Sequence, residues 1–185
     1  MNSVKANNNG GTGIFIDSDD SSLTKIQANS NGDDGIYITS DDNLLVGSTV
    51  SNNTGIGVEM LDCCSFVVAS KVQKNSSDGI ELTDGDNGVI KSSTTGNGGD
   101  GMDFPTSGDN MVTASTSTGN AGTGVDFAGS EYGIISGVQA NKNATGVSMN
   151  CRGSTASLTA EHNSSGNLVQ TVVDGPCANV DLKAP

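Results

Sequence analysis

Residues 79–104 read GIELTDGDNGVIKSSTTGNGGDGMDF, and this stretch begins and ends with the same short pattern. Gly79-Ile80-Glu81-Leu82 returns 22 positions later as Gly101-Met102-Asp103-Phe104. Both copies place a glycine before an apolar, a polar and a second apolar residue. The alternation indicates a β-strand, because successive side chains of a strand point to opposite faces.

The pattern recurs along the whole chain, with one glycine every 20 to 24 residues. We place these glycines at Gly13, Gly35, Gly55, Gly79, Gly101, Gly124, Gly146 and Gly166. A period in this range is typical of a solenoid, in which each repeat buries its apolar face against its neighbours. The sequence therefore predicts eight stacked coils.

Aligning the coils on these glycines predicts which side chains face inward. The first strand contributes Ile14, Ile36, Ile56, Ile80, Met102, Val125, Val147 and Asn167 in one column, and Ile16, Ile38, Val58, Leu82, Phe104, Phe127, Met149 and Val169 in another. A second strand contributes Leu45, Val67, Val89, Val112 and Ile134. A third, short strand contributes a column of smaller residues, namely Ala6, Ala28, Thr49, Val72, Thr94, Ser117, Ala140 and Ala160.

An asparagine three or four residues before each glycine marks a recurring corner. The set is Asn9, Asn31, Asn52, Asn75, Asn97, Asn120, Asn143 and Asn163. Asparagine tolerates the left-handed backbone region and can hydrogen-bond to copies above and below, so we expect a ladder here. Asn52, Asn75, Asn143 and Asn163 also begin Asn-x-Ser/Thr sequons, which the repeat explains better than glycosylation does.

Three short strands per turn, a stacked Asn corner and the glycine-led pattern make this sequence similar to the parallel β-helix repeat family, the carbohydrate-binding and sugar-hydrolase type of solenoid. The resemblance covers roughly Val4 to Leu182. It implies an all-β fold: a right-handed, single-stranded parallel β-helix of about eight coils, with three strands per coil and an Asn ladder at one turn. We treat residues 1–185 as one solenoid domain, either a segment of or a building block for something larger.

Composition limits the partners. The net charge is −13, from 21 acidic and eight basic residues, which disfavours nucleic acid because phosphate binding needs clustered Lys and Arg. No apolar run approaches the ~20 residues of a membrane span. We therefore expect a partner that is either extracellular polysaccharide or another copy of the chain, and a location outside the cell or on its surface.

Acidic residues occupy the outward position of the first strand in successive coils. Glu81, Asp103 and Asp126 are expected on neighbouring rungs about 5 Å apart. In the pectinolytic members of the family this face holds carboxylates that bind Ca²⁺ or perform acid–base chemistry on a sugar. The resemblance therefore implies these roles for the three residues, should the protein be an enzyme. The alternative is a solvated acidic stripe on a protein that is acidic everywhere.

Three further residues on this face are candidates for carbohydrate binding. Phe15 and Tyr37 precede the carboxylates in the same outward position, where rings stack on sugars, and Glu59 lies two residues beyond that position in the third coil.

A second acidic set lies in the turn after the first strand. The metal-ligand candidates are Asp19, Asp20, Asp41, Asp42, Asp84, Asp86 and Asp109. Asp-rich turns ligate Ca²⁺ between coils in Gly-Asp nonapeptide repeats. The alternative is that Asp and Gly are simply good turn formers. No cofactor is required by the sequence, and Ca²⁺ is the ion that it favours.

All four cysteines fall in this same turn. Cys151 and Cys177 lie in adjacent coils, so we expect a disulfide between them. Cys63 and Cys64 lie several rungs away, which leaves reduced thiols, a vicinal disulfide or a link to another chain open. Together with Met60 they also form a set of soft ligands of the kind that copper prefers.

Motifs of the family's enzymes are missing from the chain. It contains one Arg (Arg152), one His (His162) and no Asp-Pro-His-Asp tetrapeptide. The favoured hypothesis is therefore a non-catalytic structural or adhesive module, stabilised by Ca²⁺ and able to stack end to end into a fibre. The alternative is a polysaccharide-binding or polysaccharide-active domain, resembling a lyase, hydrolase or epimerase, that uses the acidic face of the first strand.

Overall fold

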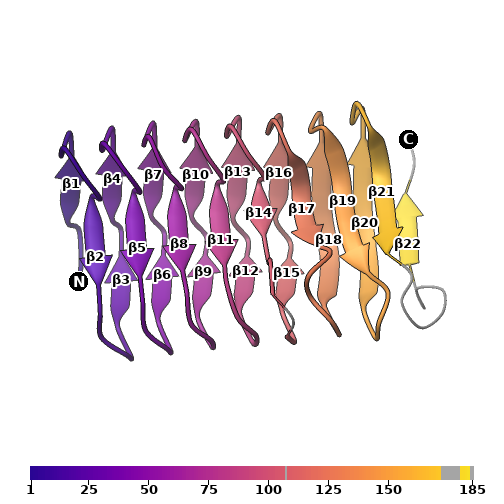
Figure 1. Ribbon diagram of the computed structural model, residues 1–185, viewed down its shortest axis with the longest axis horizontal. Coiled ribbons are helices and arrows are strands. Elements are labelled where there is room, and N and C mark those ends of the chain that lie inside the picture. The colour runs from indigo at the N-terminus through magenta and orange to yellow at the C-terminus, as the bar shows by residue number, and fades with distance from the viewer. Residues whose placement is uncertain (107, 172–179, 184–185) are drawn as a thin grey trace.

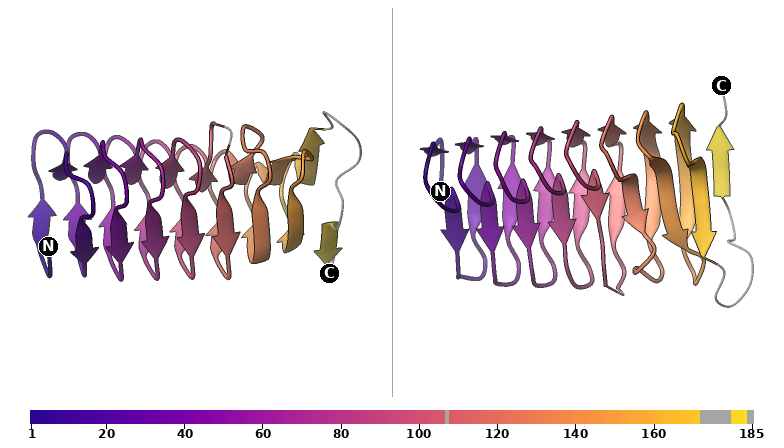
Figure 2. Two further views of the ribbon diagram at one scale, coloured as in Figure 1. Left: turned by 90° about the horizontal axis from the view of Figure 1, so that it is seen from below. Right: turned by 45° about the horizontal axis from the view of Figure 1, so that its top comes forward.

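The computed structural model describes residues 1–106, 108–171 and 180–183, which form short parallel strands wound into a rod (Figure 1). Successive coils stack along the long axis, so the described chain advances from one end of the rod to the other (Figure 2). No α-helix occurs in these residues, and they accordingly contain no helix that could span a membrane.

One face of the rod is an eight-stranded sheet, which we call sheet B. Its strands are, in order, β2 (Ile14–Ile16), β5 (Ile36–Ile38), β8 (Val58–Met60), β11 (Ile80–Leu82), β14 (Met102–Asp103), β17 (Thr123–Phe127), β19 (Thr145–Asn150) and β21 (Gly166–Thr171). Each strand pairs in parallel with the equivalent strand of the next coil, as Ile36 with Val58 and Val58 with Ile80. The first strand of every coil thus lies in one sheet, as the sequence predicts.

The other strands form a fourteen-stranded parallel sheet, which we call sheet A. The second strands are β3 (Ser22–Thr24), β6 (Leu44–Val46), β9 (Phe66–Val68), β12 (Gly88–Ile90) and β15 (Met111–Thr113). The third strands are β1 (Lys5–Asn7), β4 (Gln27–Asn29), β7 (Thr49–Ser51), β10 (Lys71–Gln73), β13 (Ser93–Thr95) and β16 (Thr116–Thr118). Toward the C-terminus longer strands replace these pairs, namely β18 (Ile134–Asn141), β20 (Thr155–Glu161) and β22 (Val180–Lys183).

The longer strands arise because β20 lacks the corner residue between the second and third strands and pairs with β18 on both sides of that position. In earlier coils one residue in the left-handed region makes this corner, for example Lys91 at φ 51° and Ala114 at φ 50°. Gly137, at φ 64°, occupies the equivalent place within β18. The pairing register shifts across it, since Ser136 pairs with Ser157 and the next pair is Val138 with Leu158. The coil of β20 thus has one residue fewer here and runs straight through the position.

The core is a narrow column of aliphatic side chains between the sheets. Most of its members are fully buried, and the larger ones include Ile36, Leu45, Ile80, Leu82 and Met102. Phe104 and Phe127 stack one above the other with ring centroids 4.4 Å apart. Each fully buried aliphatic or aromatic side chain contributes roughly 1.5–3 kcal/mol to the free energy of folding. These side chains are buried only when coils stack on one another, so stacking stabilises the rod.

The predicted asparagine ladder is present, and it satisfies backbone as well as side-chain groups. The Nδ2 of Asn53 donates to the Oδ1 of Asn75 at 2.9 Å, and the backbone N–H of Asn53 donates to the same oxygen at 3.0 Å. Asn75 repeats both bonds with Asn97. Each ladder residue therefore ties its corner to the next coil.

Two further polar ladders, which the sequence analysis did not anticipate, stabilise the other corners. Between the second and third strands, the backbone N–H of each corner serine donates to the hydroxyl of the next, as Ser48 to Ser70 and Ser70 to Ser92, both at 3.1 Å. In the turn that leads to the second strand, Asn and Ser side chains share the same role. The backbone N–H of Asn43 donates to the hydroxyl of Ser65, that of Ser65 to the Oδ1 of Asn87, and that of Asn87 to the Oδ1 of Asn110. Every corner of the coil thus carries its own stacked column of polar side chains.

The repeating glycine has a steric cause. A Cβ on Gly79 would lie 2.5 Å from the carbonyl oxygen of Gly101 and 2.7 Å from the Nδ2 of Asn97. The strand thus approaches both the next coil and the ladder too closely for any side chain. Glycine and asparagine recur together because each requires the other.

The same test corrects the predicted register of the third coil. The glycine that contacts the ladder is Gly57, whose Cβ would lie 2.6 Å from the Nδ2 of Asn75, whereas a Cβ on Gly55 would meet Asp34 of the preceding loop. The predicted position at Gly55 is therefore wrong by two residues. The irregular spacings of 20 and 24 on either side of Gly55 disappear, since Gly35, Gly57 and Gly79 follow one another at intervals of 22 residues.

Several predicted columns change with this register. Val58 and Met60 are the inward residues of β8 in place of Ile56 and Val58, Val50 replaces Thr49, and Asn53 replaces Asn52 in the ladder. Two other columns were also one residue out of place. Ile135 faces inward, with Ile134 48% exposed, and Leu168 pairs with Val147, which leaves Val169 outward and Asn167 out of the column.

Candidate functional site

One residue in each of the strands β2, β5, β8, β11, β14 and β17 points away from the core, and these residues form one continuous outward column. Consecutive strands pair Phe15 with Tyr37, Tyr37 with Glu59, Glu59 with Glu81, Glu81 with Asp103, and Asp103 with Asp126. We call Glu59, Glu81, Asp103 and Asp126 the acidic column. Glu59 thus belongs to the column itself and does not lie two residues beyond it, because the third coil has the corrected register.

Two aromatic rings form the N-terminal end of this column. Phe15 is 57% exposed, and its ring centroid lies 5.7 Å from that of Tyr37 at an interplanar angle of 39°. Glu59 follows directly on the next strand. The three predicted carbohydrate-binding candidates are therefore neighbours on one surface.

A second row of carboxylates lies beside the acidic column. Asp34, Asp78 and Asp100 each stand immediately before a glycine of the repeat. Asp34 accepts the backbone N–H of Ile56 at 2.8 Å, Asp78 accepts that of Asp100, and Asp100 accepts that of Thr123. This row was not among the residues predicted from the sequence, although an Asp directly before the glycine in three coils was a visible signal.

The two rows together create sets of carboxylates that could hold a metal ion. In each of two sets, Asp78–Glu81–Asp103 and Asp100–Asp103–Asp126, ligand oxygens lie within 4.8 Å of one another. Asp103 belongs to both. All donors are carboxylate oxygens, which suit hard cations such as Ca²⁺. The three predicted catalytic candidates, Glu81, Asp103 and Asp126, are thus brought together on adjacent strands.

Crowding of these carboxylates changes their pKa values. Burial, followed by the charges of Asp34 and Glu81, raises the pKa of Glu59 to about 7. Burial, followed by the charges of Asp126 and Asp100, raises the pKa of Asp103 to about 7. Burial and Asp78 also raise the pKa of Glu81. Each ionised carboxylate makes ionisation of its neighbour harder.

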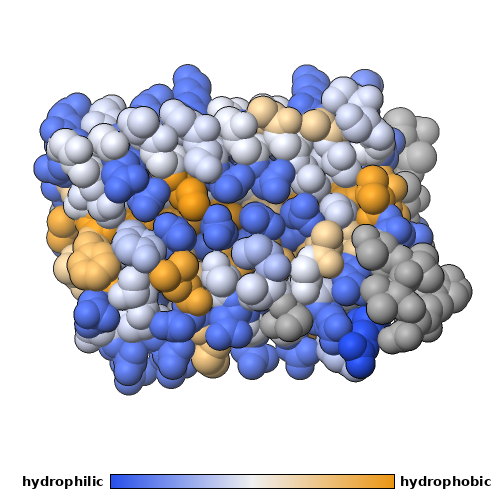
Figure 3. Space-filling view, viewed as in Figure 1, coloured by the Kyte–Doolittle hydropathy of each residue, from blue (hydrophilic) through white to orange (hydrophobic). Residues whose placement is uncertain are grey.

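Basic residues are placed elsewhere on the rod. None of the eight strands of sheet B contains Lys, Arg or His. Lys5 and Lys71 lie on sheet A, and Lys25 and Lys91 lie at its internal corner. The space-filling view shows hydrophilic side chains over the middle of the rod, interspersed with apolar ones (Figure 3). The acidic column has no counter-ion within its own sheet.

Comparison with known proteins identifies the family. The right-handed beta helix region matches residues 57–174 of the chain, which is more than half of its length. The chain belongs to the right-handed beta helix family. The comparison with curated proteins found no match.

Solved structures with the same fold include polysaccharide-active β-helices. A mutant of the periplasmic alginate epimerase AlgG has a TM-score of 0.66 at 15% identity, over 93% of this chain and 46% of that one. Pectate lyase Pel9A has a TM-score of 0.59 at 14% identity, over 94% of this chain and 55% of that one. This β-helix therefore spans about half the length of the structures it matches, and at these identities the likeness shows the fold alone.

The acidic turns of this right-handed β-helix are arranged differently from its acidic column. Asp19 accepts the backbone N–H of Asp41, and Asp41 accepts that of Cys63, at 3.2 and 3.1 Å. Asp42, Asp84, Asp86 and Asp109 lie exposed in the equivalent turns. Within the described parts of the chain, no three carboxylates of these turns come within 4.8 Å of one another. Asp19 and Asp41 thus act as hydrogen-bond acceptors between coils, and Ca²⁺ binding in these turns stays a prediction.

The structure shows which of the alternatives for Cys63 and Cys64 holds. Cys63 and Cys64 form a vicinal disulfide. Their sulfurs are therefore not free thiolates, and Met60 is fully buried in the core, so the three do not form the copper site considered from the sequence. Cys151 is buried, whereas Cys177 lies outside the described residues, so the Cys151–Cys177 disulfide stays a prediction.

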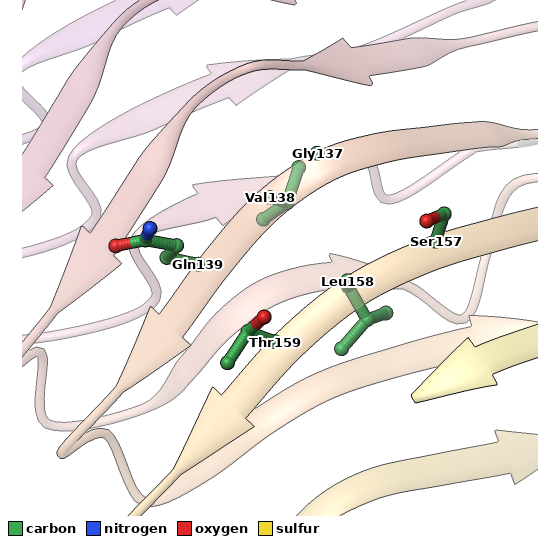
Figure 4. Close-up of a pocket in the computed structure, with 6 residues that line it drawn as sticks. All are labelled: Gly137, Val138, Gln139, Ser157, Leu158 and Thr159. Carbon is green, nitrogen blue, oxygen red and sulfur yellow. The ribbon is translucent and has the colours of Figure 1, made fainter. Parts of the chain in front are cut away.

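A small hollow marks the register shift on sheet A (Figure 4). Its volume is about 160 Å³, and the residues that line it are Gly137, Val138, Gln139, Ser157, Leu158 and Thr159. None of them titrates near neutral pH. The hollow follows from the extra residue at Gly137 and offers no acid–base or metal chemistry.

Proposed function

We propose that this β-helix binds an extracellular polysaccharide along the outward face of sheet B, with a divalent cation such as Ca²⁺ held by its carboxylates. One observation carries the proposal. A single outward column runs without interruption from the rings of Phe15 and Tyr37 into the four carboxylates of the acidic column.

The two ends of the column offer complementary contacts to a sugar polymer. The exposed ring of Phe15, with Tyr37 beside it, presents an apolar surface for the C–H face of a sugar, and the Tyr37 hydroxyl adds a polar contact. The carboxylates accept hydrogen bonds from sugar hydroxyl groups. Rungs about 4.8 Å apart repeat these contacts along the rod, so a polymer that lies parallel to the rod axis meets equivalent groups on successive coils.

A cation fits the chemistry of the acidic column. Asp103 would belong to the coordination shell in either set of three, with Asp78 and Glu81 or with Asp100 and Asp126 as the other ligands. A bound divalent ion would favour the ionised form of each carboxylate and relieve the repulsion that raises their pKa values. It would also allow an acidic polymer to bind an acidic face. The epimerase and the lyase of similar fold are named for alginate and pectate, which are both acidic polysaccharides.

The proposed role is binding and not lyase or epimerase chemistry. Removal of a proton next to a sugar carboxylate needs a general base. It also needs a group that stabilises the resulting negative charge, which the proposed Ca²⁺ would supply. Sheet B supplies carboxylates and no Lys, Arg or His.

A location outside the cytoplasm is part of the same proposal, because disulfides such as Cys63–Cys64 persist in oxidising compartments.

Calorimetric titration tests the proposal. Ca²⁺ is added to the metal-free protein, and polygalacturonate or alginate fragments are then added with Ca²⁺ or with EDTA. Asp103→Asn removes the ligand common to both sets and should weaken Ca²⁺ binding about tenfold or more. Tyr37→Ala should weaken polysaccharide binding and leave Ca²⁺ binding unchanged.

Asp181→Asn is the matched control, because Asp181 is an exposed carboxylate on β22 of sheet A, away from the acidic column. It should change neither affinity. The proposal is abandoned if no polysaccharide binds with Ca²⁺ present, or if Asp103→Asn and Asp181→Asn have equal effects.

Glycoside hydrolysis is a second candidate, and the raised pKa of Asp103 favours it. A carboxyl group with a pKa of about 7 is suited to protonate a leaving oxygen near neutral pH, and an ionised neighbour in the same set would act as base or nucleophile. A reducing-end assay on the same polymers decides between the two candidates. Turnover that Asp103→Asn abolishes would support hydrolysis, and binding without any turnover supports the binding module.

A further inference from the structure

Four Asn-x-Ser/Thr sequons occur in the chain, and the structure separates one of them from the others. Asn75, Asn143 and Asn163 are members of the asparagine ladder. Asn52 is not, because the ladder residue of its coil is the adjacent Asn53. The amide nitrogens of the four sequons therefore differ in whether they are held in the ladder or free of it.

Two sequon asparagines are enclosed by the ladder. Asn75 is 2% exposed, and its Nδ2 donates to the Oδ1 of Asn97. Asn143 is 3% exposed, and its Nδ2 donates to the carbonyl oxygen of Ser117 at 3.0 Å. A sugar on either nitrogen would have to occupy the space between stacked coils, and it would break the contacts that form the corner.

Asn163 is half-buried, but both hydrogens of its amide are engaged. Its Nδ2 donates to the carbonyl oxygen of Ala140 at 2.9 Å and to the Oδ1 of Asn167 at 3.0 Å. A glycosylated amide retains a single hydrogen. Attachment of a sugar here would therefore break one of the two bonds.

Asn52 has the opposite surroundings. Its side chain is exposed, and its backbone is left-handed at φ 57°, which turns it outward at the corner. Its Nδ2 donates one hydrogen bond, to the hydroxyl of Ser51 at 3.1 Å. The equivalent corner residues of the neighbouring coils, Ser30 and Lys74, are also exposed, and so is Thr54, the hydroxyl residue of the sequon.

We propose that Asn52 is an N-glycosylation site, and that the folded β-helix carries an N-linked glycan there but not at Asn75, Asn143 or Asn163. In this reaction an oligosaccharide is transferred from a polyprenyl-phosphate-linked donor. A bond forms between C1 of the first sugar and Nδ2 of Asn52, the bond from C1 to the phosphate oxygen breaks, and Nδ2 loses one proton as the lipid phosphate departs. The remaining N–H can still donate to Ser51.

The glycan would extend from a corner next to sheet A. Ser51 ends β7, a third strand of that sheet, whereas the proposed polysaccharide face is sheet B. The inference is independent of the proposed function, since the two surfaces share no residue.

Expression of the full chain in a glycosylating secretory host tests the inference. Secreted and cell-associated protein are denatured, reduced and treated with peptide N-glycosidase in ¹⁸O water, which labels each formerly glycosylated Asn. Trypsin is added only afterwards, in ordinary water, because it makes Asn75 and Asn143 N-terminal and the glycosidase does not act on an N-terminal Asn. Cleavage after Lys and Arg leaves the four sequons on separate peptides, which span residues 26–71, 75–91, 143–152 and 153–183. The secreted protein should carry the label at Asn52 and at none of the other three sites.

Two variants complete the test. Asn52→Gln and Thr54→Ala should each abolish the glycan-dependent mobility shift of the secreted protein while its circular dichroism spectrum stays unchanged. Sugar on Asn75 or Asn143 is expected only in cell-associated chains that have not folded. Secreted protein with an unmodified Asn52, or with a glycan on any of the other three asparagines, would overturn the inference.

Discussion

Glu59 stands directly opposite Glu81 on the neighbouring parallel strands β8 and β11, with both side chains on the outward face of sheet B. Paired like charges normally destabilise a sheet. Here burial raises the pKa of Glu59 to about 7, and the charges of Asp34, Glu81 and Asp33 add to the effect. The hydroxyl of Tyr37, on the other side of Glu59, supplies no positive charge. Protonation of Glu59 therefore makes the stability of the fold depend on pH.

We predict that Glu59→Gln stabilises the metal-free protein above neutral pH. A carboxyl group with a raised pKa in the folded state binds its proton more tightly there than in the unfolded chain. The free energy of unfolding then falls as the pH rises from about 4.5 to about 7. Glutamine removes this loss, so at pH 8 in EDTA the variant should gain about 1 kcal/mol, an amount reduced by solvent screening, or about 2–4 °C in melting temperature.

The comparison across pH makes this prediction specific. At pH 4 the wild-type carboxyl group is protonated in the folded protein, and the two proteins should melt at nearly the same temperature. Asp20→Asn, which neutralises an exposed turn carboxylate, should not change the difference between pH 4 and pH 8. An equal gain at both pH values would show that the effect of Glu59→Gln is not electrostatic.

The ladder predicts a large difference between two adjacent asparagines. Asn53→Ala removes two donors and an acceptor, and it leaves the buried N–H of Asn31 and the carbonyl oxygen of Ala28 without their partners. Buried unsatisfied groups cost about 1–3 kcal/mol each, so we expect a loss of about 3 kcal/mol. Asn52→Gly should be nearly neutral, because Asn52 is exposed and glycine tolerates its left-handed backbone. Urea unfolding measures both, and similar losses would contradict the assigned register.

The repeating glycine yields a third prediction. A Cβ on Gly79 would lie 2.5 Å from the backbone oxygen of Gly101, and the next coil cannot yield without losing its own hydrogen bonds. Gly79→Ala should therefore cost about 3 kcal/mol, at the upper end of overpacking effects. Gly11→Ala is the control, because a Cβ there meets nothing within 4 Å. If thermal melts show that both variants are equally stable, close approach of the coils does not explain the glycine.

Much of this fold could be predicted from the sequence because two patterns indicate the same coils. These patterns are the repeat of about 22 residues and the alternation of apolar and polar residues within each strand. The error in the third coil arose where two glycines competed for one role. Gly55 and Gly57 stand two residues apart, and a shift of two preserves the inward and outward alternation of a strand. Only contact with the next coil separates them, because a Cβ at Gly57 meets the ladder whereas one at Gly55 meets Asp34. That information is absent from a single coil.

The candidate site was less predictable for the same reason. Glu81, Asp103 and Asp126 could be aligned because their coils have the correct register, whereas Glu59 was displaced along with the third coil. Asp78 and Asp100 were overlooked because they precede the strand and resemble ordinary turn residues. Their role depends on the distance between coils, which brings Asp78 close to Glu81 and Asp103. The carboxylate sets combine residues of adjacent coils, so they cannot be recognised from the sequence of one coil alone.

Peptide mapping under non-reducing conditions tests the cysteine assignments. The Cys63–Cys64 bond lies within one tryptic peptide, residues 26–71, so it should appear as a mass about 2 Da below that of the reduced peptide. The predicted Cys151–Cys177 bond would instead join two peptides, residues 143–152 and 153–183, into one species that a reductant separates. Because the bond would tie the last turn to the coil before it, Cys177→Ser should lower the melting temperature more than Cys63→Ser. A cross-link between peptide 26–71 and either C-terminal peptide would contradict the stacking order of the coils, since several rungs separate them.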